Sequence, residues 1–218
     1  MYYKKNLKKV HKENIKYLLL FVITALILVS CGGKKSEKMV FKPTPLNGKD
    51  AAITAGNKKS NFSTLDRIHM LSLSSNDSID NDVRSLLRFG FATLPEEVTI
   101  DSAFIYLYSI DPGHFGKDNA FVLEPLKSIW INKEINWEGQ PNSDPSKAIK
   151  LEAPKTKDQN YKINVTDYVS NVTKNLQPNY GFMLKLENEK KSYKGVRFHS
   201  SDSKAEEKRP KLEVYFSK

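Results

Sequence analysis

Apolar and polar side chains alternate along much of this chain with a period of two residues, and this pattern constrains the fold more than any other feature. Between residues 99 and 108, one face of an extended strand would carry Ala103, Ile105 and Leu107. The opposite face would carry an aromatic row, Phe104, Tyr106 and Tyr108. Such alternation predicts β-strands, because successive side chains of a strand point to opposite faces of a sheet.

Similar runs recur along the chain and are separated by residues that favour turns. The expected strands cover residues 51–54, 68–73, 85–89, 99–108, 121–126, 161–165, 180–186, 196–200 and 211–216. One short helix is expected around residues 165–176, where valine and leucine recur at helical spacing and Thr166 would be the N-cap. The sequence therefore predicts an all-β fold, a β-sandwich or jelly roll of about nine or more strands with one short helix.

The first thirty residues have the composition of an export signal. Six lysines precede or border an apolar run at residues 17–29, which is shorter than the roughly 20 apolar residues that a membrane-spanning helix needs. A basic start before a short apolar run is typical of a secretory signal peptide. The sequence Leu-Val-Ser-Cys-Gly at residues 28–32 resembles the lipobox of bacterial lipoproteins. The resemblance implies cleavage before Cys31 and attachment of a diacylglycerol lipid to its thiol; the alternatives are an uncleaved signal anchor and a cytosolic chain with an apolar N-terminus.

These features divide the chain into a signal peptide at residues 1–30, an acylated flexible tether at 31–46 and one β-sandwich domain at 47–218. The tether is polar and lysine-rich and contains Pro43 and Pro45. Cys31 is the one cysteine of the chain, so its expected role is lipid attachment and not disulfide formation. Acylation would hold the domain on membrane lipid in the cell envelope. We expect the outer membrane, at its periplasmic face or at the cell surface.

Removal of the signal peptide lowers the net charge from +10 to +5, because this segment holds six lysines and one glutamate. The remaining positive charge is moderate and favours acidic polymers or lipid headgroups as partners. The sequence has no nucleic-acid-binding motif, so a nucleic-acid partner is not expected.

Eight segments of the domain, together with Pro95 and Trp130, resemble the DNRLRE-domain family in order and spacing. They are residues 50–53, 84–89, 98–108, 135–141, 164–169, 179–184, 196–201 and 209–214. The resemblance implies a jelly roll of a kind also classed among carbohydrate-binding modules, which is attached to polysaccharide-degrading or cell-surface proteins and in some cases binds glycans. The chain departs from the family pattern at Gly90, where an acidic residue is usual, and the letters of the family's name do not occur as a string. The ligand is therefore left open.

Glycan recognition requires aromatic rings for the apolar face of a sugar and polar groups for its hydroxyls and carboxylates. The aromatic row is one candidate, because Phe104 and Tyr106 occupy positions where the family more often has small or polar residues. The row would form a stacking platform or a protein contact, unless a loop or the tether covers it. Trp130 is a second candidate for stacking, with core packing as its alternative, and Trp137 is expected in the core.

Two pairs of basic side chains are candidates for binding carboxylates or sulfates. Arg84 and Arg88 fall on one face of their strand, and Arg197 and His199 fall on one face of theirs. A guanidinium binds a planar anion through two parallel hydrogen bonds, so these pairs favour an acidic polysaccharide. Ordinary cross-strand ion pairing is the alternative for each pair.

Catalytic and metal-binding signals are weak. Oxygen-rich loops at residues 77–82 and 111–119 would suit calcium, but neither has a recognised ligand spacing, so solvated turns are expected and no cofactor is predicted. A polysaccharide lyase could use Tyr193 and His199 as its acid and base and Arg197 to neutralise the uronate carboxylate, although only their proximity in the sequence suggests it.

The sequence thus predicts a lipid-anchored cell-envelope protein whose non-catalytic β-sandwich binds a polysaccharide. The first alternative is a structural or assembly lipoprotein that docks another envelope protein through the aromatic row. The lyase is a second and weaker alternative.

Overall fold

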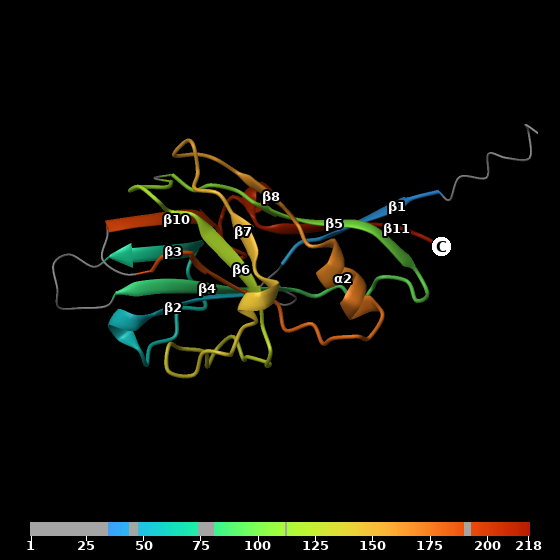
Figure 1. Ribbon diagram of the computed structural model, residues 1–218, viewed down its shortest axis with the longest axis horizontal. Helices are drawn as coiled ribbons and strands as arrows, with labels where there is room; N and C mark the ends of the chain where they lie inside the picture. The colour runs from blue at the N-terminus through green and yellow to red at the C-terminus, as the bar shows by residue number, and fades with distance from the viewer. Residues whose placement is uncertain (1–34, 44–47, 74–80, 112, 190–192) are drawn as a thin grey trace, which may run out of the picture. The chain divides into compact units, whose positions relative to one another are not determined.

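Two antiparallel β-sheets build the domain in the computed structural model, which describes residues 35–43, 48–73, 81–111, 113–189 and 193–218 (Figure 1). The smaller sheet, sheet A, has the strand order β1 (Glu37–Phe41), β11 (Lys211–Ser217), β5 (Thr99–Leu107) and β8 (Tyr161–Asn164). The expected signal peptide and Cys31 lie outside the described residues.

The larger sheet, sheet B, has the strand order β10 (Tyr193–His199), β3 (Arg67–Leu73), β4 (Asp82–Phe89), β9 (Phe182–Leu186), β6 (Phe121–Pro125) and β7 (Ile149–Leu151). Strand β2 (Gly48–Thr54) also belongs to this sheet and pairs with β4 along its whole length. Helix α2 (Thr166–Thr173) follows β8, and the short 3₁₀ helices are η1 (Ala55–Asn57), η2 (Pro145–Lys147) and η3 (Glu206–Lys208). This arrangement confirms the predicted all-β sandwich with one short α-helix.

Residues 37–41 form strand β1, so the expectation that the flexible tether extends to residue 46 is wrong for them. Every residue of β1 pairs with a residue of β11, and Met39 and Phe41 pack against the core. Strand β1 is only five residues long and polar residues surround it, so the sequence alone does not distinguish this strand from a flexible tether. The sequence does not predict strand β7 for a similar reason, since three residues are too few to establish a period.

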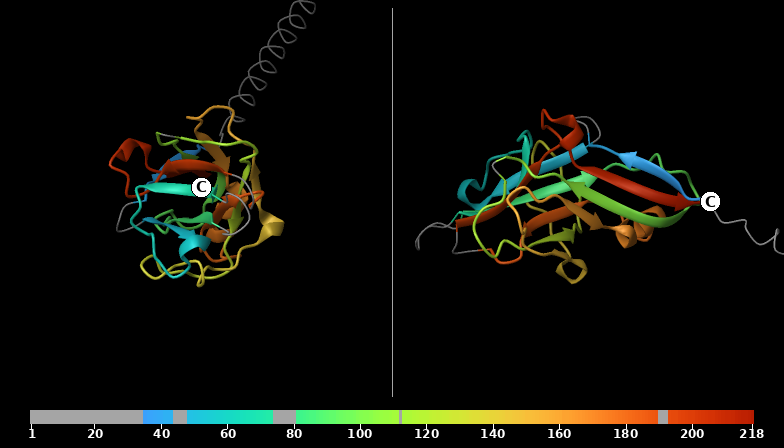
Figure 2. Two further views of the ribbon diagram at one scale, coloured as in Figure 1. Left: turned by 90° about the vertical axis from the view of Figure 1, so that its left-hand side faces the viewer. Right: turned by 90° about the horizontal axis from the view of Figure 1, so that it is seen from above.

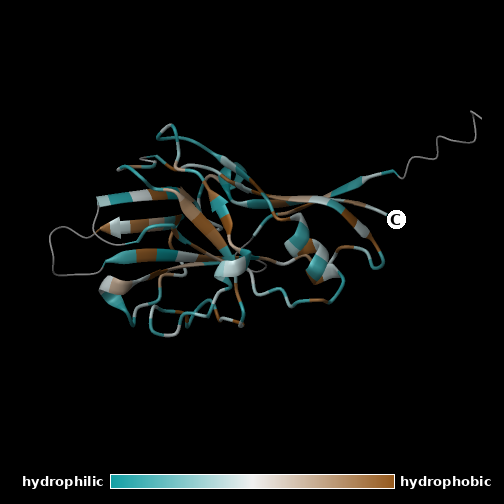
Figure 3. Ribbon diagram, viewed as in Figure 1, coloured by the Kyte–Doolittle hydropathy of each residue, from teal (hydrophilic) through white to brown (hydrophobic). Residues whose placement is uncertain are grey.

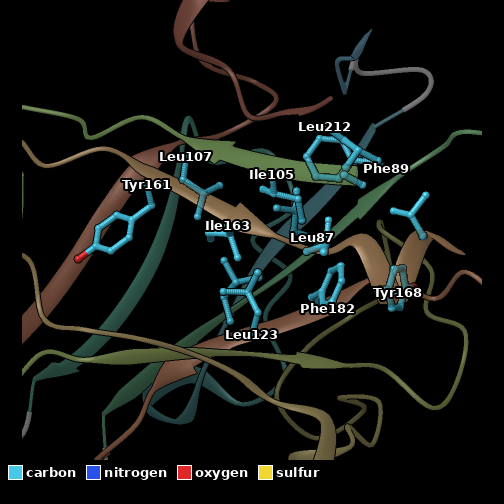
Figure 4. Close-up of a cluster of buried hydrophobic side chains, with 14 of the residues drawn as sticks. Leu87, Phe89, Ile105, Leu107, Leu123, Tyr161, Ile163, Tyr168, Phe182 and Leu212 are labelled. Carbon is cyan, nitrogen blue, oxygen red and sulfur yellow. The ribbon is translucent and has the colours of Figure 1, made fainter. Parts of the chain in front are cut away.

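The main core lies between the inner faces of the two sheets. Ile105, Leu107 and Ile163 of sheet A face Leu87 and Leu123 of sheet B, and all five side chains are almost fully buried (Figure 4). Burial of one such side chain stabilises the fold by roughly 1.5–3 kcal/mol. The period-two pattern that predicted the strands is visible as alternating brown and teal along β10 (Figure 3).

A second, smaller cluster lies on the outer face of sheet B. Leu86 points away from the main core and packs with Ile53 and Met183. The segment between β6 and β7 supplies Trp130 and Ile135, which cover these side chains. Both faces of β4 are therefore buried around Leu86, and the sandwich gains a third layer at this position.

Helix α2 starts at Thr166, but this residue is not the N-cap, contrary to the expectation. The N-cap is Val165, whose side chain makes no capping hydrogen bond. Asn164 takes this role: its Oδ1 accepts hydrogen bonds from the backbone N–H and the hydroxyl of Thr166, at 2.9 and 2.6 Å. The Thr166 hydroxyl oxygen in turn accepts a bond from the N–H of Ala103 and ties the helix to β5. In the part of the chain that the structure describes, no helix is both long and apolar enough to cross a membrane.

Candidate functional site

A groove with a volume of ≈ 860 Å³ opens at the β10 edge of sheet B. Two loops contribute to it, residues 109–111 and 113–115 after β5 and residues 157–158 before β8, and η3 contributes Lys208. The first loop is held against β10 by two backbone hydrogen bonds between Phe115 and Gly195, at 3.0 and 2.9 Å. Strand β10 itself contributes its outward-facing side chains Tyr193, Arg197 and His199. The structure therefore brings the predicted pair of Arg197 and His199 into one concave site.

Arg197 is the central cation of the groove. Its guanidinium carbon lies 4.6 Å from the centre of the Phe115 ring, and its Nε is buried without a hydrogen-bond partner. Within the described residues Arg197 has no ion pair, which leaves its charge available to an anionic ligand. The groove also contains two further cations and two carboxylates, Lys157, Lys208, Asp111 and Asp158.

Two buried histidines lie beside Arg197 in the groove. The Nδ1 of His114 accepts a hydrogen bond from the backbone N–H of Arg197 at 3.2 Å, so its proton resides on Nε2, which donates to the carbonyl of Gln159 at 2.9 Å. The Nδ1 of His199 lies 2.7 Å from the Ser203 hydroxyl. Burial lowers the pKa of both imidazoles, and for His199 the positive charge of Lys208 lowers it further. Both rings are consequently neutral at physiological pH.

A third histidine, His69, pairs with Arg197 across strands β3 and β10. Both of its ring nitrogens are buried and lack hydrogen-bond partners among the described residues. Burial, followed by the charges of Arg67 and Arg197, lowers the pKa of His69 to about 4. The cross-strand neighbour of Arg197 on β3 is thus an uncharged imidazole and not a carboxylate, so it does not compensate the charge of the guanidinium.

Tyr193 supplies an open aromatic ring at the groove. It is 67 % exposed, and its ring centre lies 4.9 Å from that of Phe115. Phe115 therefore contacts both Tyr193 and Arg197. An exposed tyrosine next to a guanidinium can receive the apolar face of a sugar ring while the cation binds a carboxylate.

The aromatic row lies on the outer face of sheet A, where the alternation predicted it. Phe104, Tyr106 and Tyr108 are each half-buried, and Figure 2 (right) shows β1, β11 and β5 side by side with no other element in front of them. The strand register places Lys211 and Lys162 directly on either side of Tyr106. The Nζ of Lys162 lies 4.1 Å from the centre of Phe104, and that of Lys211 lies 4.5 Å from the centre of Tyr106. Ammonium groups thus rest on two of the three rings.

Glu213 is the acidic residue beside Tyr106 on this face, and its charge is compensated by its neighbours. Its carboxylate lies 2.7 Å from the Nζ of Lys211 and 3.9 Å from that of Lys38, and it accepts a hydrogen bond from the Tyr215 hydroxyl at 3.2 Å. The hydrogen bond with Lys211 keeps the pKa of Glu213 below its ordinary value. Lys162 has no ion pair within the described residues, so no carboxylate neutralises its ammonium group at this position.

Arg84 and Arg88 lie on the same face of β4 but in different surroundings. The guanidinium of Arg84 binds the Glu189 carboxylate through Nε and a terminal nitrogen, at 2.7 and 2.5 Å, and donates to Gln140 at 2.8 Å. It also stacks on Trp137 at 4.7 Å. Arg84 is therefore engaged in structural contacts, whereas Arg88 is half-buried and has no ion pair within the described part of the chain.

The ligand-binding candidate Trp130 requires a correction. Its side chain is 3 % exposed, lies in the second hydrophobic cluster and donates its indole N–H to the carbonyl of Tyr180 at 3.0 Å. A ring without an open face cannot stack on a sugar, so Trp130 stabilises the fold. Trp137 packs against the same cluster, where it was expected.

The oxygen-rich loops are not gathered into a metal site among the described residues. Asp77 and Asp80 lie outside the described residues. Asn81 accepts a bond from Thr54, and Asn119 donates to the carbonyls of Phe115 and Gly195. These amides hold loops in place.

Sequence reasoning did not find the groove itself. These groove residues come from two loops and from η3, and none forms a motif with Arg197 in the sequence: His114, Phe115, Lys157 and Lys208. The one available signal was the pairing of Arg197 and His199 on one strand face. The rest depends on the pairing of Phe115 with Gly195 of β10, which no local sequence pattern indicates.

The sequence profile of carbohydrate-binding module family 96 matches residues 44–215. The chain belongs to this family. No curated protein matches the chain.

The family 96 match covers every strand of the domain except β1 and the last residues of β11. It confirms that the domain is a carbohydrate-binding module, as the sequence resemblance implied. The groove and the aromatic row both lie within the matched residues.

Proposed function

We propose that this protein is a lipid-anchored component of the cell envelope whose family 96 domain binds an acidic polysaccharide without cleaving it. The groove at β10 is the proposed binding site. One observation carries this assignment: the same concave site contains an exposed tyrosine ring and a guanidinium that forms no ion pair with any residue the structure describes. A uronic acid offers complementary groups, since its ring has an apolar face and its carboxylate is planar.

The anchor rests on the sequence around Cys31. A diacylglycerol group on this thiol would fix the domain to membrane lipid, and each buried methylene adds about 0.8 kcal/mol of membrane affinity. We infer the outer membrane as the location. The test is intact-mass analysis of the native product, which is expected to start at Cys31 and to carry the mass of an acylated N-terminus; an unmodified chain that starts at Met1 would refute the anchor.

Glycan binding is tested by affinity electrophoresis in gels that contain polygalacturonate, alginate or hyaluronan, with xylan and cellulose derivatives as neutral comparisons. We expect retardation by at least one uronate polymer and weaker retardation by the neutral ones. Tyr193→Ala is expected to abolish most of the retardation. Ile129→Ala is the matched control, because Ile129 is 66 % exposed but lies outside the groove. Equal migration in all gels would refute the proposal.

A lyase is a second candidate, because the groove unites the residues that the sequence suggested for it. Tyr193, Arg197 and His199 all line the groove, and neutral His199 could accept a proton. Cleavage by β-elimination would produce an unsaturated uronate that absorbs in the ultraviolet. Incubation with the same uronate polymers is expected to give no rise in absorbance, and a rise that His199→Ala abolishes would replace binding by catalysis as the function.

A further inference from the structure

We propose that the aromatic row on sheet A continues the groove at β10, so that the two form one track for an extended acidic polysaccharide. This inference rests on the proposed function and names the form of its ligand: an internal stretch of a long chain and not a terminal sugar or a short oligosaccharide.

The two sites are joined through the backbone of β5 and its following loop. Tyr108 ends the aromatic row, and the next residue, Ser109, lines the groove. The carbonyl of Tyr108 accepts a hydrogen bond from the N–H of His199, which also lines the groove, at 2.9 Å. The chain that leaves β5 can be followed into the loops beside β10 (Figure 1).

The row has the dimensions and chemistry that a polymer requires. From Phe104 to Tyr108 a strand advances by about 13 Å, which adds room for more than one sugar ring to the groove. Tyr106 stands between two lysines, since Lys211 and Lys162 are its cross-strand neighbours. Tyr106 and its two lysines thus combine an aromatic ring with positive charge, as Tyr193 and Arg197 do in the groove.

The charges along the track favour a polyanion. Its cations are Lys162, Lys211, Lys208, Lys157 and Arg197, and its carboxylates are Glu213, Asp111 and Asp158. Glu213 is already paired with Lys211, whereas Lys162 rests on Phe104 without an ion pair in the described residues. Lys162 is exposed and flexible, so its ammonium group can move from the ring to a ligand carboxylate without a change in the backbone.

The test measures affinity against ligand length. Oligomers from disaccharides to decasaccharides are prepared from whichever of polygalacturonate, alginate and hyaluronan retards the protein most, and their binding to the full mature protein is measured by calorimetry. We expect affinity to rise beyond the length that fills the groove. Tyr106→Ala is expected to weaken decasaccharide binding several-fold and to leave disaccharide binding unchanged, whereas Tyr193→Ala weakens both.

Val40→Ala is the control for the sheet surface. Val40 is 44 % exposed on β1, on the same face as the row but separated from β5 by β11. Its substitution is expected to leave both affinities unchanged. Affinity that stops rising at the disaccharide, or a Tyr106→Ala variant that binds the decasaccharide like the unsubstituted protein, would overturn the track. Failure of every oligomer to bind would instead refute the proposed function.

Discussion

Removal of the charge of two arginines is expected to have opposite effects: one substitution lowers ligand affinity, and the other lowers the stability of the fold. Arg197→Gln removes the uncompensated guanidinium of the groove. A hydrogen bond to a charged group contributes about 1.5–3 kcal/mol, so the dissociation constant for a uronate ligand should rise roughly 10- to 150-fold. Folding stability should change little. The Nε of Arg197 has no hydrogen-bond partner among the described residues, and the contact of the guanidinium with Phe115 contributes only about 0.5–1 kcal/mol at a partly exposed position.

Arg84→Gln has the reverse expectation. Arg84 and Glu189 are mostly buried, with 21 % and 15 % of their side chains exposed, and the substitution leaves the Glu189 carboxylate without its partner. The free energy of unfolding should fall by about 2 kcal/mol, which lowers the melting temperature of a domain of this size by about 4–8 °C. Ligand affinity should be preserved, because Arg84 does not line the groove.

The assay is the same for both variants: calorimetric titration with the best uronate oligosaccharide and thermal unfolding followed by circular dichroism. The expected pattern is lost affinity at unchanged melting temperature for Arg197→Gln, and the converse for Arg84→Gln. An Arg197→Gln variant that binds like the unsubstituted protein would refute the assignment of the groove. An Arg84→Gln variant that loses affinity while its melting temperature stays the same would show that the ligand binds at β4 instead.

Three further predictions concern stability. His69 has a pKa of about 4 in the folded state against an ordinary 6.5, so the folded state loses stability relative to the unfolded state as the pH falls from 6.5 towards 4. His69→Leu removes this titration, and in urea unfolding at about pH 5 the variant should be spared about 2 kcal/mol of the acid destabilisation. Burial raises the pKa of Asp50 to about 6, a shift whose stabilising effect is lost as the pH rises through 6, so Asp50→Asn should make acid destabilisation steeper; a flatter profile would contradict this sign. Trp130→Ala should cost about 3–5 kcal/mol in urea unfolding, because the ring is buried, and should spare ligand affinity in the fraction that stays folded.

The elements of the fold were predictable where their periodicity extends over enough residues. β5 could be located from nine residues of alternation, and its two faces were assigned correctly because Ile105 and Leu107 alternate with Phe104 and Tyr106. β1 could not, since its outer residues are exposed and its stability comes from pairing with β11, the last strand of the chain. Local pattern cannot indicate a partner that lies so far away in the sequence.

The candidate site was predictable only in part, for a related reason. Charge and strand alternation identified Arg197, but nothing local distinguishes it from Arg84, which is equally basic and also lies on a strand face. The difference lies in what the fold brings to each: Glu189 and Gln140 reach Arg84, whereas Phe115 and a neutral His69 lie beside Arg197. Whether an arginine is free for a ligand is thus decided by residues from other segments.

The position of β1 also bears on how the proposed anchor would present the site. Residues 32–36 separate Cys31 from Glu37, so a fully extended connection from an acylated cysteine to the sandwich spans at most about 20 Å. β1 begins at the end of the domain opposite to the loops of the groove (Figure 1). The chain would therefore enter the domain at one end, next to the membrane, and the groove would open at the other end. A polymer bound in the groove would then continue along β5, towards the end of the domain at which β1 begins. A ligand too long for the groove alone could therefore bind along the domain even though the anchor is short.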